Sequence, residues 1–74
     1  MRIRLKNREE FKKILLMEGY SHRGLSRKLG LSEPYVNQIA NGERNPSAQT
    51  AKKIIELLGK RFEDIFIIFD NNKS

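Results

Sequence analysis

Few side chains in this sequence could carry out catalysis. Its 74 residues include one histidine, His22, no cysteine, and no glycine-rich phosphate loop. A cysteine-ligated metal, a disulfide or a catalytic thiol is therefore excluded, and His22 has no second histidine with which to share a metal. The acidic pairs Glu9-Glu10 and Glu63-Asp64 fall where helices are expected to begin, and the helix dipole accounts for them there. We expect no enzyme activity, no metal and no cofactor.

Positive charge is the clearest feature of the composition. Fifteen Lys and Arg residues against nine Asp and Glu residues give a net charge of +6, with a sequence pI of about 10.0. Such an excess favours a polyanionic partner, either nucleic acid or, less commonly, an anionic membrane surface. The longest apolar run, residues 65–69, is far shorter than the roughly 20 residues of a membrane helix. Because the N-terminus also lacks a signal-peptide core, we expect a cytoplasmic protein.

Capping signals predict helices within a single domain over residues 1–74. Two helices begin after a polar cap and end at a glycine, with Asn7 and Gly19 bounding about 8–18 and Ser47 and Gly59 bounding about 48–58. Residues 62–66 can form a short fifth helix, and residues 71–74 are a polar tail. A strand over the β-prone residues 67–69 could pair with residues 2–6.

The segment between residues 21 and 41 predicts two short helices joined by a turn. Ser21 and Ser32 cap these helices, and Gly30 can adopt the positive φ that turns the chain between them. Pro34 falls in the first turn of the second helix, where its missing N–H costs nothing. The two helices are expected to pack through Leu25, Leu29, Leu31, Val36 and Ile39, with the small Ser26 allowing close approach. A short glycine-centred turn between two helices is the helix-turn-helix signature.

Basic and apolar residues alternate at the N-terminus, which leaves two interpretations open. Period-two alternation over residues 2–6 indicates a half-buried strand, with Ile3 and Leu5 facing the core. Alternatively, Arg2 and Arg4 belong to a disordered basic arm that reaches along DNA. We favour the strand.

The segment SHRGLSRKLGLSEPYVNQIANGERNPS closely resembles the phage-repressor and Cro-like helix-turn-helix family, called XRE. The residues that carry the resemblance are Leu25, Ser26, Leu29, Gly30, Leu31, Ser32, Val36, Ile39, Asn41, Gly42, Arg44, Asn45, Pro46 and Ser47. The resemblance extends over about residues 8–66. It implies an all-α, lambda-repressor-like DNA-binding domain of four to five helices, to which the two terminal segments could add a short two-stranded sheet.

The outer face of the second helix of the motif is expected to read bases. At about 100° per residue, Val36 and Ile39 define the buried side, so the opposite side holds Pro34, Asn37, Gln38 and Asn41, with Glu33 beside them. The resemblance implies that positions at the start and middle of this helix touch base edges. We therefore expect readout by Glu33, Pro34, Asn37 and Gln38. A solvated polar face with no ligand is the alternative for the same residues.

Phosphate contacts are implied by the resemblance at two places, the start of the first motif helix and the loop after the second. The matching residues are His22, Arg23, Asn41, Arg44 and Asn45. Tyr35 points nearer the core, so it either packs there or reaches a phosphate with its hydroxyl. The additional charges of Arg27 and Lys28 are better explained as a solvated helix face.

Three positions depart from the family pattern. Gly24 occurs where a helix former is usual and, in the middle of a helix, is expected to cost about 1 kcal/mol relative to Ala. Ala40 takes a position where the family often has Glu, and Pro34 is unusual in the base-reading helix.

Residues 21–45 contain four basic and two acidic residues, a net charge of only +2, so much of the excess positive charge lies at the N-terminus.

These observations predict a sequence-specific double-stranded DNA-binding transcriptional regulator, a repressor from a bacterium or phage. A monomer of this size reads few base pairs, so we expect a homodimer, at least on DNA, on a palindromic operator. Residues 66–69 are a candidate dimer interface, or else core. Regulation would come through expression level or a protein antagonist. The alternative is an antitoxin or protein-interaction module with the same fold, in which DNA binding is secondary.

Overall fold

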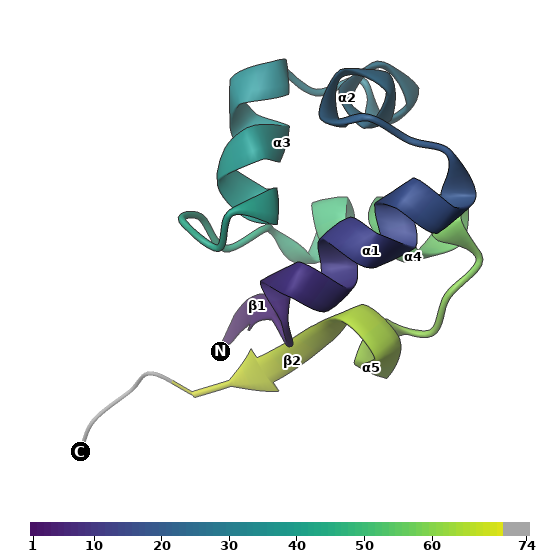
Figure 1. Cartoon of the computed structure of the whole chain (residues 1–74). Helices are drawn as coiled ribbons and strands as arrows, with labels where there is room; N and C mark the ends of the chain where they lie inside the picture. Colours follow the sequence, from purple (N-terminus) through teal and green to yellow (C-terminus); the bar gives the residue numbers. More distant parts are fainter. Residues whose placement is uncertain (71–74) are drawn as a thin grey trace.

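The computed structural model describes residues 1–70, which form five helices and a two-stranded sheet, arranged as in Figure 1. In chain order the elements are β1 (Arg2–Leu5), α1 (Arg8–Glu18), α2 (His22–Leu29), α3 (Glu33–Ala40), α4 (Ala48–Leu58), α5 (Phe62–Ile65) and β2 (Phe66–Phe69). The predicted helical fold with a small terminal sheet is confirmed. The predicted polar tail, residues 71–74, lies outside the described residues.

Each of the first four helices begins at the cap that the sequence predicts. In all four, a side-chain oxygen of the cap accepts a hydrogen bond from the backbone N–H three residues later, at 2.9–3.3 Å, and the caps are Asn7, Ser21, Ser32 and Ser47. Such a bond satisfies an amide that has no partner within the helix. The fifth helix is one residue shorter than predicted, because Phe66 has an extended backbone (φ −121°, ψ 159°) and begins β2.

The N-terminal segment is a strand, so the alternative of a disordered arm is wrong. β1 runs antiparallel to β2, with Arg2 opposite Phe69 and Leu5 opposite Phe66. A further backbone bond of 2.8 Å from the Lys6 N–H to the Ile65 carbonyl continues the pairing. Leu5 is buried whereas Arg2 is exposed, as expected when alternate side chains point to opposite faces. The first and last described elements therefore lie side by side.

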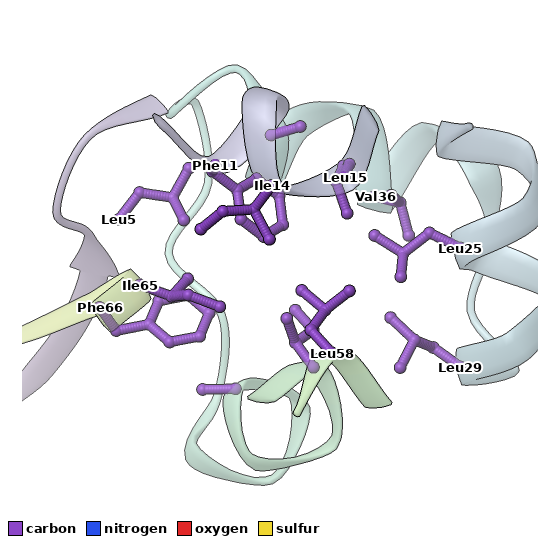
Figure 2. Close-up of a cluster of buried hydrophobic side chains, with 13 residues drawn as sticks. Leu5, Phe11, Ile14, Leu15, Leu25, Leu29, Val36, Leu58, Ile65 and Phe66 are labelled. Carbon is purple, nitrogen blue, oxygen red and sulfur yellow. The ribbon is translucent and has the colours of Figure 1, made fainter. Parts of the chain in front are cut away.

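The core lies between α1, α4 and the helix pair α2–α3, and the sheet closes its other end (Figure 2). Phe11 and Leu15 of α1 face Leu58 of α4 in the middle of this cluster. At one end Leu25, Leu29 and Val36 are contributed by α2 and α3, and at the other end lie Leu5, Ile65 and Phe66. Phe66 is only 1% exposed. It therefore belongs to the core, so of the predicted interface 66–69 only the later residues reach the surface.

Gly24 does not lie in the middle of a helix, contrary to the sequence prediction. Because α2 begins at His22, Gly24 is its third residue and donates its N–H to the Ser21 cap at 3.0 Å. A β-carbon at this position would lie 3.2 Å from the Ser21 Oγ, which is tighter than an ordinary contact. The glycine therefore leaves room for the cap, and the predicted cost for a helix interior does not apply.

The helices are short. The two longest, α1 and α4, have 11 residues each. Within residues 1–70, no helix combines the length and the apolar character needed to cross a membrane.

Candidate nucleic-acid interface

α2 and α3 form a rigid pair joined by a tight turn. Gly30 ends α2 with φ +70° and ψ 32°, a left-handed conformation that costs glycine little. The N–H of Leu31 then bonds back to the Ser26 carbonyl at 2.9 Å, which completes the turn. Ser26 is only 5% exposed, and its hydroxyl donates to the Arg23 carbonyl at 2.7 Å, so its small polar side chain is satisfied between the helices. The predicted helix-turn-helix geometry is present.

The two sides of α3 differ in burial as the helical arithmetic predicts. Val36, Ile39 and Ala40 are at most 2% exposed and face the rest of the domain. The predicted base-reading residues lie on the other side, where Glu33 and Pro34 are exposed and Asn37 and Gln38 are half-buried. Ala40, where the family often has Glu, is completely buried and belongs to the core.

Two predicted phosphate-contacting residues at the start of α2 touch predicted base-reading residues of α3. The His22 Nδ1–H donates to the Asn37 Oδ1 at 2.8 Å, in a partly buried contact. The Arg23 Nε lies 3.8 Å from the Glu33 Oε1, in an ion pair whose side chains are 70% and 46% exposed. An exposed pair at this distance is weak. The shorter histidine bond therefore does more to orient its partner, the amide of Asn37.

Arg44, in the loop after α3, contacts the same helix from its other end. Its guanidinium lies 5.1 Å from the centre of the Tyr35 ring, a cation–π distance. Its Nη1 also donates to the Gln38 Oε1 at 3.4 Å. Tyr35 is half-buried and is not part of the apolar cluster, so its predicted alternative of core packing is wrong, and its ring supports Arg44. A carbonyl oxygen has two lone pairs, so Gln38 can hold this long contact and still accept from a base.

Arg8 contributes a contact that the sequence analysis missed. From the first turn of α1, its Nη1 donates to the carbonyl of Asn41, the residue that ends α3, at 3.0 Å. A guanidinium at the carboxyl end of a helix satisfies a free carbonyl and complements the helix dipole. The two residues are 33 positions apart in the chain, so no local spacing could reveal the contact. The N-terminal charge thus helps to hold the end of the candidate base-reading helix.

A helix-turn-helix family model matches residues 11–65, which is most of the chain. The chain belongs to this XRE-type helix-turn-helix family. The match begins inside α1 and ends with α5, so β1 and β2 lie outside the part that the family shares.

A curated relative of this helix-turn-helix chain is an uncharacterized HTH-type transcriptional regulator from Methanocaldococcus jannaschii. The two sequences are 40% identical over 47 residues, which cover 64% of this chain and 71% of the relative. The family resemblance predicted from the motif is therefore confirmed by an independent similarity.

The predicted phosphate-contacting residues of this helix-turn-helix domain form two groups, one at each end of α3. His22 and Arg23 lie at the start of α2, beside the first turns of α3. Asn41 ends α3, and Arg44 and Asn45 follow in the loop before α4. The two groups thus flank the candidate base-reading face.

Proposed function

We propose that this protein is a sequence-specific DNA-binding transcriptional regulator that acts as a repressor, with α3 in the major groove. One observation carries the proposal, namely that α3 is held by a buried face on one side while four polar or exposed residues occupy its other side. A helix held in this way fits the major groove, where each base pair presents its own pattern of donors and acceptors. The helix-turn-helix match and the similarity to a transcriptional regulator support the same function.

The chemistry of the outer face defines what each side chain can read. The amides of Gln38 and Asn37 can each accept from N6 and donate to N7 of an adenine. Glu33 can accept from the N4 amino group of cytosine, and Pro34 can contact a thymine methyl group. The hydrogen bond from His22 restricts the orientation of Asn37, whose Oδ1 it occupies in part. Gln38 is therefore the residue we expect to make the strongest base discrimination.

The two groups that flank α3 supply contacts to the backbone. His22 and Arg23 lie beside the first amides of α2, which have no acceptor within the helix and suit a phosphate oxygen. At the other end of α3, we expect Asn41, Arg44 and Asn45 to contact phosphates, and the Tyr35 hydroxyl, from the first turn of α3, is a further candidate for such a contact. Such contacts fix the position of the protein on DNA without selecting a sequence.

The protein is proposed to bind as a homodimer on a palindromic operator. Two-fold symmetric modules of this kind place their α3 helices in half-sites about 34–36 Å apart along one face of DNA. On β2, Ile68 is 57% exposed and offers an apolar surface for a second copy. We further propose that repression is controlled by the protein's concentration or by a protein antagonist.

A selection of bound sequences from random DNA tests this function, with Gln38→Ala as the diagnostic variant. We expect the wild-type protein to enrich a defined sequence. The variant should lose preference at one base position, at a cost of about 1–3 kcal/mol for that base pair. Equal weakening on all sequences would contradict base readout by Gln38, and failure of the wild type to enrich any sequence would contradict the proposed function.

A second candidate function is a protein-interaction module, such as an antitoxin. It is favoured by two apolar side chains on α1, Leu16 and Met17, which are 80% and 73% exposed. DNA binding that is weak and insensitive to salt would support this alternative, because binding through phosphates falls steeply as salt rises.

A further inference from the structure

A basic hollow lies between the N-terminal strand and the loop that follows α3. It has a volume of about 260 Å³ and is lined by β1, the first residues of α1 and the α3–α4 loop. Its charged lining residues are all cationic, namely Arg4, Lys6, Arg8 and Arg44, and the amides of Asn7 and Asn45 lie between them. Residues 40 positions apart in sequence thus meet in one concave surface, which we call the basic cleft.

The side chains of the basic cleft are held by neutral groups. The Arg4 guanidinium lies 5.5 Å from the centre of the Phe69 ring, on the neighbouring strand. Arg8 donates to the Asn41 carbonyl at 3.0 Å, and the Lys6 ammonium donates to the Glu63 carbonyl at 2.9 Å. A ring orients Arg4, and backbone carbonyls orient Arg8 and Lys6. A guanidinium that uses one N–H in this way keeps the others for a second acceptor.

The basic cleft is continuous with the candidate base-reading face. Arg44 lines the cleft and also contacts Tyr35 and Gln38 of α3. A second hollow beside it shares Arg44 and Asn45 and adds Arg2 from the start of β1. A band of positive charge therefore runs from the end of α3 to β1.

We infer that the basic cleft binds DNA phosphates that flank the segment facing α3, with Arg4 and Arg8 as the contacting residues. The inference rests on the proposed function, and it extends the DNA-contacting surface of the protein beyond the helix-turn-helix. Planar guanidinium groups match the geometry of phosphate oxygens and can bind them through two parallel hydrogen bonds. Arg4 of β1 and Arg8 at the start of α1 both lie outside residues 11–65, so the inferred contact is made by residues that precede the part of the chain that the family model matches.

The test measures how binding to a long duplex of mixed sequence depends on salt. The Arg4→Gln variant removes one cation of the cleft, and Arg4→Lys keeps the charge. Lys53→Gln is the matched control, because this exposed residue of α4 lines a different hollow, between α2 and α4. Thermal unfolding of each variant checks that the fold is kept. Should Arg4→Gln unfold at the assay temperature, Arg8→Gln replaces it, since it removes a second cation of the cleft.

We expect Arg4→Gln to reduce the slope of log affinity against log salt by about one, which corresponds to one phosphate contact. Between 50 and 200 mM salt, the wild-type affinity should therefore fall about 3.5-fold more than that of the variant. Arg4→Lys and Lys53→Gln should keep the wild-type slope.

Three results would overturn the inference in distinguishable ways. If the wild type binds DNA and Arg4→Gln keeps its slope, the cleft does not contact phosphate, but the proposed function stands. If Arg4→Lys, which keeps the charge but cannot form the two parallel hydrogen bonds, flattens the slope as much as Arg4→Gln, the salt dependence does not follow the charge of the cleft and the inference is wrong. If the wild type binds no duplex, both the inference and the proposed function are wrong.

Discussion

Short polar contacts between helices orient the outer side chains of α3 before any ligand binds. The His22–Asn37 hydrogen bond of 2.8 Å is short and partly buried, whereas the Arg44–Gln38 contact of 3.4 Å is long and exposed. Since hydrogen bonds weaken with distance, Asn37 is fixed more firmly than Gln38. Gln38 can therefore adjust to a base edge, while Asn37 presents one orientation.

This difference defines the expected effect of removing Arg44. We expect Arg44→Ala to weaken binding to every sequence and to flatten the salt slope by about one, without changing which bases are preferred. The long contact to Gln38 is too weak to determine base preference, so only the phosphate contact should be lost. Binding of selected and unselected duplexes at two salt concentrations measures both effects, with Lys53→Ala as a control for loss of charge. An altered base preference would show that Arg44 positions Gln38.

For single residues, the sequence predicted which side chains lie on each face of α3. It did not predict which residues of other elements contact them. Helical arithmetic separates Val36 and Ile39 from Asn37 and Gln38, because the period of a helix is fixed. It cannot bring Arg8 to Asn41, because that contact depends on how α1 packs against α3. The pairing of His22 with Asn37 likewise requires the crossing of two helices, which no spacing within one helix specifies.

At the scale of elements, the ends of the helices were the most predictable feature. An N-cap needs only a side-chain oxygen and the amide three residues later, so the signal is local and can be read directly from the sequence. α5 was predicted less well, since Phe66 could continue a helix by its type. It is instead extended because pairing with Leu5 begins at that residue, and this pairing joins opposite ends of the chain.

The turn between α2 and α3 should depend on glycine at one position only. We expect Gly30→Ala to lower the free energy of unfolding by about 1–2 kcal/mol, because φ is +70° and an L side chain is strained there. A β-carbon at this site would meet nothing within 4 Å, so the cost is conformational and not steric. Urea unfolding measures it. In Gly24→Ala the backbone is ordinary and only the Ser21 cap is crowded, so this control should change stability by less than about 1 kcal/mol.

At the scale of the whole molecule, the sheet joins the two ends of the described chain beneath the helices. β1 and β2 lie outside the family match, yet they supply Leu5 and Phe66 to the same core as α1 and α4. A chain of 74 residues buries a small hydrophobic core, so each buried side chain supplies a large share of the stability. One face of the sheet therefore completes the core, and the basic residues on β1 are proposed to extend the candidate DNA surface.

Substitutions on β2 should distinguish its buried residue, which stabilises the core, from its exposed residue. Phe66 is 1% exposed, and its ring centre lies 5.5 Å from that of Phe62, so Phe66→Ala should lower the free energy of unfolding by about 3–5 kcal/mol. Because small domains are stable by only about 5–15 kcal/mol, much of the stability would be lost.

Ile68 lies two residues further along the same strand and is 57% exposed. Ile68→Ala should therefore lower the free energy of unfolding of the monomer by less than about 1 kcal/mol. Thermal unfolding at several protein concentrations compares the two variants. A large loss in Ile68→Ala that grows with concentration would assign Ile68 to a dimer interface, and a small loss in Phe66→Ala would show that the sheet does not hold the core together.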